Sequence, residues 1–348
     1  MRIAQIAPLA EAVPPERYGG TERVVGDLTA ELGRRGHEVT LFASGDSTAP
    51  ADLIAPTRQS LRTDPTAQDK LAPHIQELGQ AFERSDSFDI MHSHVDYIAF
   101  PAAALSRTPT VHTLHGRLDL PHLRPLFAQF RGLPFVSISD AQRAPLDGLG
   151  INWMATIYHG LPLDEYPFDP DGGEQLVYLA RMSREKRPDL AIEVAKRAGM
   201  KLTMAAKIDP TDKDYFEREI RPLLDHPLIE FIGEVDLQQK VELLGRARAL
   251  LFPIDWPEPF GLVMIEAMAC GTPVVTRPFG AVPEIIAHER TGLVASSVEE
   301  LVDAVKRVDR LDRRECRREV KERFSVARMA ADYERVYRQI IETPRETS

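Results

Sequence analysis

Short apolar runs alternate with amphipathic stretches along almost the whole chain. In its first half, apolar runs of strand length lie at residues 3–7, 38–43, 88–92, 110–114, 135–138 and 154–158. Stretches with helical spacing of apolar residues lie between them, at 21–32, 67–84, 97–105, 121–130 and 141–146. Strands separated by helices predict βαβ units, and therefore a parallel sheet that is covered by helices on both faces.

The alternation restarts after residues 160–173, a segment that is rich in Pro, Gly and Asp and that we interpret as an interdomain linker. Strands are predicted at 176–179, 202–205, 229–232, 249–252 and 274–276, with helices at 188–198, 212–224 and 237–246. A last helical pattern runs from about residue 326 to 341. We predict an α/β protein with two Rossmann-like, doubly wound domains and an interdomain cleft. The domains are expected at 1–165 and 166–324, with a C-terminal helix in 325–348 that crosses back to the first domain.

Composition narrows the class of protein. The chain has 348 residues, 43% of them hydrophobic, and a formal net charge of −10. Because both halves carry an acidic excess, neither nucleic acid nor an anionic membrane is expected as the main partner. Only Cys270 and Cys316 occur, so no disulfide framework is expected, and the absence of a long apolar run or a signal-like N-terminus favours a cytoplasmic protein.

The candidate chemistry begins with two glutamates that are eight positions apart. Glu258 lies in a loop flanked by prolines, and Glu266 lies in a short helix that is predicted to open at about Phe260. The first N–H groups of such a helix, those of Gly261, Leu262 and Val263, have no partner within the helix and form an anion site that suits phosphate. The alternatives are an exposed loop carboxylate for Glu258 and a partnership with a nearby cation for Glu266.

Two cations follow the first strand of the second domain. Arg181 and Lys186 lie in a βα turn, where they could neutralise a diphosphate, or they could simply be solvated. Gly280-Ala-Val-Pro-Glu284 forms another turn into a helix, for which we prefer a structural role.

The first domain offers a glycine turn and several histidines. Gly19 and Gly20 precede a helix for which Thr21 is a candidate N-cap, and they would let the backbone approach a sugar phosphate or would simply form the helix entry. His115 ends a strand and is expected to face the crevice, whereas His112 is interpreted as a packed or surface residue.

No metal site is expected. His92-Ser-His94-Val-Asp96 has a metal-like composition but lacks the further ligands of a stable site. Asp169-Pro-Asp171 and Asp212-Lys-Asp214 are interpreted as turn and cap residues. Arg117, Arg124 and Arg131 recur every seven residues and could form a basic stripe, either solvated or facing an anionic acceptor.

Arg181 and Lys186 combined with Glu258 and Glu266 resemble the signature of the family-4 retaining glycosyltransferases of GT-B fold. The Gly-Thr-Pro-Val-Val run after the second glutamate and the Gly-Ala-Val-Pro-Glu run match it too. The resemblance is strong over most of the second domain and looser over the first. It implies that the two cations bind the donor diphosphate, that Glu258 contacts the donor sugar and that Glu266 binds the ribose.

Further site residues are implied by the same resemblance. The base would lie near Gly233–Val235, and backbone amides around Phe260–Leu262 would face the sugar and phosphate. Gly19 and Gly20 would belong to a glycine-rich loop, and His115 would contact the donor sugar. The catalytic set is therefore predicted to be His115, Arg181, Lys186 and Glu258, and the donor-binding set is Gly19, Gly20, Arg181, Lys186, Gly233, Val235, Glu258, Phe260, Gly261, Leu262 and Glu266.

The expected activity is transfer of a hexose from a UDP- or GDP-sugar to an acceptor hydroxyl with retention, without a metal or any other cofactor. The nucleotide-diphosphate sugar is the co-substrate, and a small molecule or a glycan is the acceptor. The alternatives are a GT-B sugar-nucleotide epimerase, an inverting transferase, and a non-catalytic sugar-binding protein of two domains.

Overall fold

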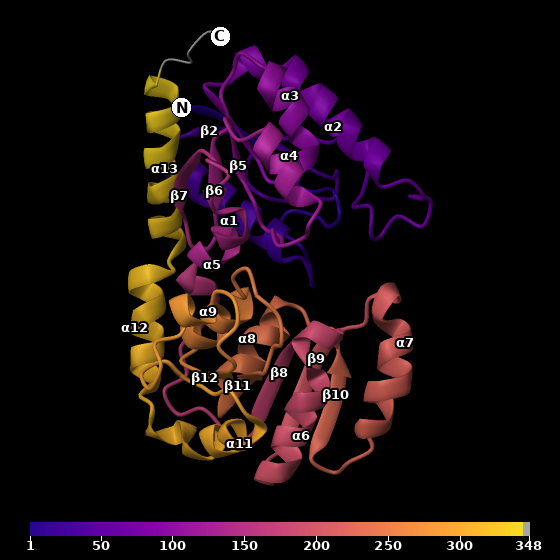
Figure 1. The fold of residues 1–348 in the computed structure, drawn as a ribbon, viewed down its shortest axis with the longest axis vertical. Helices are drawn as coiled ribbons and strands as arrows, with labels where there is room; N and C mark the ends of the chain where they lie inside the picture. Colours follow the sequence, from indigo (N-terminus) through magenta and orange to yellow (C-terminus); the bar gives the residue numbers. More distant parts are fainter. Residues whose placement is uncertain (344–348) are drawn as a thin grey trace. The chain divides into compact units, whose positions relative to one another are not determined.

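The computed structural model describes residues 1–343 and divides the chain into two compact units. The first unit consists of Met1–Gly160 together with the segment that begins at Val326, and the second unit is Leu161–Ser325. Residues 344–348 of the predicted C-terminal segment lie outside the described part. Figure 1 follows the chain from one unit to the other and back.

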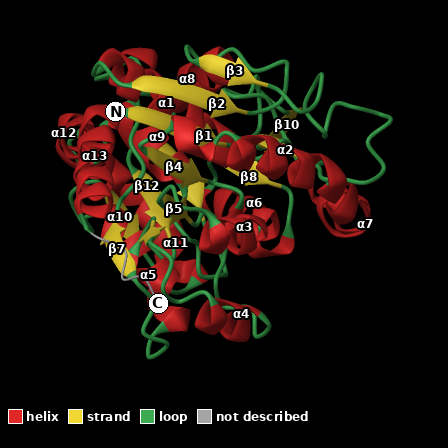
Figure 2. Ribbon diagram, turned by 90° about the horizontal axis from the view of Figure 1, so that it is seen from above, coloured by secondary structure: helices red, strands yellow, loops and turns green. Residues whose placement is uncertain are grey.

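The first unit is built on a seven-stranded sheet in which all strands run parallel, in the order β3-β2-β1-β4-β5-β6-β7. Its strands are the arrows in the upper part of Figure 1 and are drawn in yellow in Figure 2. They are β1 (Arg2–Ile6), β2 (Glu38–Phe42), β3 (Asp52–Ile54), β4 (Ile90–Ser93), β5 (Thr110–Thr113), β6 (Phe135–Ser137) and β7 (Trp153–Thr156).

The helices of the first unit include one from the far end of the chain. They are α1 (Gly20–Arg34), α2 (Leu71–Glu83), α3 (Phe100–Leu105), α4 (Leu123–Gln129), α5 (Asp140–Arg143) and α13 (Val326–Glu342), with 3₁₀ turns at Ser85–Ser87, Asp96–Ala99 and Ala144–Leu146. Helix α13 packs against α1, where the Glu334 carboxylate accepts a hydrogen bond from Arg35 Nε at 2.6 Å. The Arg35 guanidinium and His37 lower the pKa of Glu334 to about 2, which indicates a firmly held contact.

The second unit repeats the architecture with six parallel strands in the order β10-β9-β8-β11-β12-β13. The strands are β8 (Leu176–Arg181), β9 (Leu202–Lys207), β10 (Ile229–Gly233), β11 (Ala249–Phe252), β12 (Val274–Thr276) and β13 (Gly292–Val294). The α-helices are α6 (Pro188–Ala198), α7 (Lys213–Tyr215), α8 (Leu237–Gly245), α9 (Leu262–Ala269), α10 (Val282–Ile285), α11 (Val298–Arg307) and α12 (Arg313–Arg323).

Shorter turns complete the second unit. They are 3₁₀ turns at Leu163–Glu165, Arg184–Lys186, Pro210–Asp212, Arg221–Leu223 and Val308–Arg310, and a π-turn at Phe216–Ile220. The predicted linker contains the first of these turns. None of the helices described in the chain is long and apolar enough to cross a membrane.

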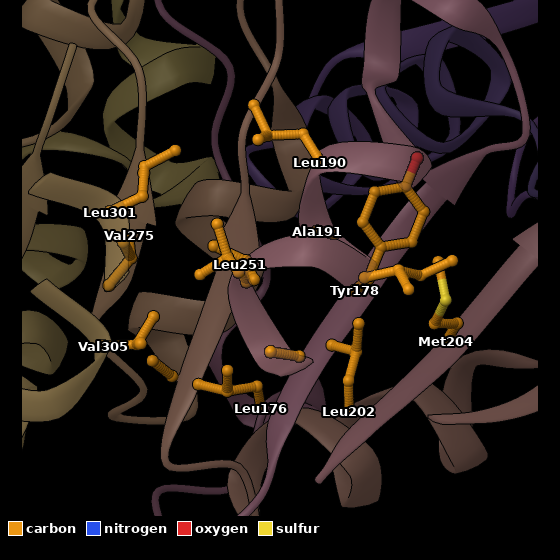
Figure 3. Packing of buried hydrophobic residues seen from close by; sticks show 14 of the residues in the cluster. Leu176, Tyr178, Leu190, Ala191, Leu202, Met204, Leu251, Val275, Leu301 and Val305 are labelled. Carbon is orange, nitrogen blue, oxygen red and sulfur yellow. The ribbon is translucent and has the colours of Figure 1, made fainter. Parts of the chain in front are cut away.

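The core of the second unit lies between its sheet and the helices α6 and α11. Figure 3 shows inward side chains from β8 (Leu176, Tyr178) and β9 (Leu202, Met204) meeting those of the neighbouring helices. All four are fully buried, so the sheet is held rigidly below the loops that leave its carboxyl edge.

The predicted fold class, two parallel α/β units, is confirmed, but four elements were not predicted and one predicted helix is not α-helical throughout. The unpredicted elements are β3, β13, α11 and α12. Residues 212–224 were predicted as one helix, and a continuous helical segment is observed, but its type changes along its length: α7 (Lys213–Tyr215) passes into the π-turn Phe216–Ile220 and then into the 3₁₀ turn Arg221–Leu223. Pro222 lacks the N–H that a regular α-helix needs and clashes with the preceding turn, which disfavours the α form near it.

Candidate active site

The predicted site residues of the second unit gather at one edge of its sheet. Strand β8 is followed along the chain by β9 on one side, and its other neighbour, β11, is followed by β12 on the far side. At such a switch point the loops leave in opposite directions and open a crevice at the carboxyl ends of the strands. Arg181 ends β8, Lys186 lies in the following turn, and Glu258 and α9 follow β11.

Glu258 is buried, with 7% exposure, and is held through one of its two oxygens. Oε2 accepts hydrogen bonds from Lys186 Nζ and from Trp256 Nε1, the latter at 2.9 Å. Lys186 also lies over the Trp256 ring, 4.7 Å from its centroid, which adds a cation–π contact. Among the described residues no hydrogen bond reaches Oε1, so this oxygen can accept one from a ligand hydroxyl.

The backbone of residues 280–281 packs closely against the backbone of Glu258 and holds the loop of this glutamate in place. The Ala281 N–H donates to the Glu258 carbonyl at 2.8 Å, and Gly280 has a φ of 58°. A Cβ at Gly280 would lie 2.2 Å from the Glu258 nitrogen, so only glycine fits. The structural role that we preferred for residues 280–284 is thus observed: they lead into α10 and position Glu258, and Glu284 lies in the first turn of the helix.

Helix α9 begins at Leu262, slightly later than predicted. Its N-cap is Gly261, whose φ of 82° is left-handed, and Phe260 before it is buried at 2% exposure. The described hydrogen bonds give no acceptor to the backbone N–H groups of Leu262 and Val263. These donors stand at the positive end of the helix, where a negative group is stabilised.

Glu266 lies in α9 and repeats the arrangement of Glu258. Its Oε1 accepts hydrogen bonds from Lys240 Nζ and from the Tyr166 hydroxyl, the latter at 3.2 Å, and it is 4% exposed. The alternative of a nearby cation is therefore observed. No hydrogen bond from a described residue reaches Oε2, so a second donor can still bind there. Lys240 belongs to α8, which begins just after Gly233–Val235. The segment predicted to bind the base is therefore followed by the helix whose lysine bonds to Glu266.

Arg181 makes its ion pairs away from Glu258. Its guanidinium pairs with Glu185 and, at 3.3 Å from Nε, with Asp212. Asp212 occupies the N-cap position of α7, as expected for a residue at a helix start, but its side chain pairs with Arg181 and makes no capping bond. Asp169, in contrast, accepts backbone N–H bonds from Asp171 and Gly172 and forms the expected turn.

The glycine turn of the first unit lies at the start of α1. Gly19 is the N-cap, with a φ of 145°, and Gly20 is the first, exposed residue of the helix. The expectation that Thr21 caps this helix was wrong, since it lies inside the first turn and no side chain caps α1.

His115 follows β5 and is partly exposed. Its Nε2 lies 2.9 Å from His94 Nδ1, its ring stacks on that of His159 with centroids 5.3 Å apart, and its backbone N–H bonds to the Asp96 carboxylate. Although the residue as a whole is partly exposed, its Nδ1 atom is buried and has no hydrogen-bond partner among the described residues. Burial lowers the pKa of His115 to about 3, so the imidazole is neutral at physiological pH.

The other candidates of the first unit have structural surroundings. His112 is buried against the rings of Phe100 and Phe135, as expected for a packed histidine. His92 takes part in the same hydrogen-bonded network as His94, and no group of three potential metal ligands occurs within residues 1–343.

The arginine stripe does not lie on one helix. Arg117 precedes α4 and pairs with Asp119, Arg124 lies in α4 and donates to the Pro145 carbonyl, and Arg131 follows α4.

Three neighbours of the glutamates were missed in the sequence. Lys240, Tyr166 and Trp256 hold the two carboxylates, yet they come from α8, from the predicted linker and from the loop after β11. The one available signal was the buried setting of Glu266 in an apolar helix, which demands a donor or a cation. Which residue supplies it depends on tertiary packing.

Comparison with known families and proteins covers nearly the whole chain. The family model "Glycosyltransferase Family 4" matches residues 18–165, and "Glycosyl transferases group 1" matches residues 166–323. The glycogen synthase of Mycobacterium tuberculosis (strain CDC 1551 / Oshkosh) is 27% identical over 336 residues, which covers 80% of this chain and 79% of the relative.

Solved structures agree on the fold. AviGT4, a glycosyltransferase of avilamycin A biosynthesis, has a TM-score of 0.76 at 22% identity, covering 99% of both chains. Anabaena Alr3699/HepE, solved in complex with UDP-glucose, has a TM-score of 0.74 at 19% identity, covering 97% of this chain and 100% of that one. The two parallel α/β units match those of GT-B glycosyltransferases. The chain belongs to the glycosyltransferase family described by these two models, group 1 and family 4, and is a glycosyltransferase.

Proposed function

We propose that this glycosyltransferase transfers a hexose from a UDP- or GDP-sugar to an acceptor hydroxyl with retention of anomeric configuration. The observation that carries the proposal is the matched pair of Glu258 and Glu266 on either side of the start of α9. Each carboxylate is buried, is neutralised by a lysine and keeps one oxygen without a described hydrogen bond. A ligand with hydroxyls at both ends and a diphosphate between them fits this arrangement, and a nucleotide-diphosphate sugar is such a ligand.

In this proposal the second unit binds the donor. Glu258 Oε1 accepts a sugar hydroxyl and Glu266 Oε2 a ribose hydroxyl, while the base lies near Gly233–Val235. A helix rises about 1.5 Å per residue, so Glu266 lies roughly one turn beyond Leu262, which leaves the helix start to the phosphates.

The charge of the diphosphate is matched by the helix start and by two cations. Lys186 Nζ has three N–H donors and uses one on Glu258, which leaves two for phosphate oxygens. Arg181 would turn part of its guanidinium from Glu185 and Asp212 to the diphosphate. We therefore propose that these groups support the leaving group without a divalent ion.

For the first unit we propose acceptor binding and the predicted donor contacts of Gly19, Gly20 and His115. The relative solved with UDP-glucose supports a nucleotide-sugar donor, and membership of the family supports the retaining course. As the diphosphate leaves, its oxygen can take the proton of the attacking hydroxyl, so no separate protein base is required.

A nucleotide-sugar screen tests the donor. Thermal stabilisation identifies the nucleotide sugars that bind, and ¹H NMR of the initial product gives its anomeric configuration. We expect transfer that persists in EDTA and a product with the configuration of the donor. An inverted product, or an epimerised donor with no need for an acceptor, would refute the proposal.

Two matched variants test the glutamates. Glu258→Ala is expected to abolish transfer while largely sparing nucleotide affinity, and Glu266→Ala is expected to weaken nucleotide affinity. Near-normal activity in both would contradict the assignment.

A further inference from the structure

A chain of buried polar groups in the first unit connects α13 with His115. The Tyr337 hydroxyl accepts a hydrogen bond from Gln5 Nε2 at 3.3 Å, and Gln5 Oε1 lies 2.8 Å from His94 Nε2. His94 Nδ1 in turn lies 2.9 Å from His115 Nε2. Gln5, His94 and Tyr337 are almost fully buried, with at most 2% exposure, so no water competes for these bonds.

The chemistry of Gln5 decides where each proton lies. An amide oxygen only accepts, so the nitrogen that faces it, His94 Nε2, carries the hydrogen. His94 is neutral, since burial lowers its pKa well below the usual value, and its Nδ1 is therefore bare. The hydrogen bond between the two imidazoles must then come from His115 Nε2–H. His115 is also neutral, which leaves its Nδ1 as a lone-pair acceptor.

Tyr337 extends this relay to His92. With Gln5 oriented as observed, the Tyr337 oxygen accepts from the amide nitrogen, and its own hydrogen is then available to His92 Nδ1, 2.7 Å away. If the Gln5 amide were reversed, every proton of the relay would move to the opposite nitrogen, and His115 would present Nδ1–H, a donor. The orientation of one amide therefore sets whether His115 donates or accepts.

We propose that Gln5, His94 and Tyr337 are positioning residues that hold His115 as its Nε2–H tautomer, so that Nδ1 accepts a hydroxyl of the bound sugar. The nature of the ligand rests on the proposed function, whereas the relay itself does not. A neutral imidazole accepts a sugar hydroxyl without adding positive charge to a reaction in which the anomeric carbon becomes cationic.

The tautomer of His115 can be measured first, without any donor sugar. Protonated and bare imidazole nitrogens differ in ¹⁵N chemical shift, so a long-range ¹H–¹⁵N spectrum of histidine-labelled protein shows which nitrogen of His115 carries hydrogen. The His115→Gln variant assigns its signals. The relay predicts Nε2–H in the unmodified protein. An Nδ1–H signal would overturn it, whatever the enzyme transfers.

Tyr337→Phe removes the group that orients the Gln5 amide, and Tyr333→Phe is the matched control. Both hydroxyls are buried on α13, but that of Tyr333 bonds to Thr113, which meets the other nitrogen of His92, and it makes no bond to Gln5. We expect Tyr337→Phe to give a mixture of His115 tautomers and Tyr333→Phe to keep the Nε2–H form. Equal spectra for the two variants would overturn the positioning role of Tyr337.

Kinetics then connect the relay to the sugar. Once a donor is known, Tyr337→Phe should lower kcat/KM about three- to tenfold, the effect of one hydrogen bond. A donor deoxygenated at the contacted hydroxyl should make this variant and the unmodified enzyme equal. If the tautomer shifts but kcat/KM does not for any donor, His115 makes no such contact; that result refutes the sugar contact and leaves the relay standing.

Discussion

Replacing Lys240 by Met should destabilise the second unit and weaken nucleotide binding. The substitution leaves the Glu266 carboxylate buried, with the Tyr166 hydroxyl as its one remaining donor among the described residues. Removing one partner of a buried ion pair costs about 3–5 kcal/mol. Because the Lys240 side chain retains 15% exposure and water can reach its place, we expect the lower value, about 3 kcal/mol. For a unit of this size that is a Tm lowered by about 6–12 °C.

The two tryptophans make the assay specific to one unit. Trp153 lies in the first unit and Trp256 in the second, so in a Trp153→Phe background the fluorescence reports the second unit alone. Urea unfolding followed at this probe gives the free energy difference. Lys196→Met, at an exposed lysine of α6, is the matched control and should change stability by less than about 0.5 kcal/mol.

A double variant separates the buried charge from the lost side chain. In Lys240→Met/Glu266→Gln the amide is neutral and still accepts from Tyr166, so most of the lost stability should return, while nucleotide affinity should stay at least tenfold reduced. The reasoning is refuted if Lys240→Met costs less than 1 kcal/mol, or if the double variant is no more stable than the single one.

Other predictions concern separate features. In Gly280→Ala the new Cβ, 2.2 Å from the Glu258 nitrogen, should displace that loop and lower transfer at least tenfold with nucleotide affinity retained; Gly199→Ala, also at positive φ but with open space around it, is the control and should keep full transfer. Burial lowers the pKa of His112 to about 3, so below pH 6.5 the unfolded chain binds a proton that the folded chain refuses, and acid destabilises the protein through this residue. His112→Leu removes that contribution, so its stability relative to the unmodified protein should rise by about 1 kcal/mol between pH 7 and pH 5.5; a difference that stays constant with pH would contradict the burial argument. Glu334→Gln should lower the stability of the first unit, because Arg35 loses its charged partner on α13, and Trp153 fluorescence in a Trp256→Phe background measures this change.

The sequence predicted the fold wherever local signals agree with the packing. Helix α6 was predicted with its observed bounds, because Pro188 opens it and Gly199, in a left-handed conformation, closes it. Strand β3 was not predicted, because it is short and largely exposed and therefore shows no apolar run. Helix α12 was not predicted because its own residues are mostly charged and show little apolar periodicity. For α11, the Ser297/Glu300 capping box is a signal in the sequence that indicates a helix start.

The chemistry of the candidate site was predictable from local sequence, but its contacts were not. A buried glutamate in an apolar helix needs a donor, and the structure names Lys240 and Tyr166, which are far from it in sequence. The same holds for His115, whose hydrogen-bonding state depends on a glutamine of β1 and a tyrosine of α13. Long-range partners are set by the arrangement of strands and helices, which no local pattern reports.

The discontinuity of the first unit has a consequence for how the protein matures. The second unit is one continuous stretch, residues 161–325. Once these residues have left the ribosome, every strand and helix of this unit has been made. The first unit is incomplete until α13 has been made, because the hydroxyls of Tyr333 and Tyr337 on this helix form hydrogen bonds with Thr113 and His92 on its buried strands. We therefore expect the second unit to complete its fold before the first during synthesis, the reverse of the usual order in which the N-terminal domain is completed first. A nascent chain stalled before Val326 would carry a finished C-terminal half beside an N-terminal half with open polar groups in its core.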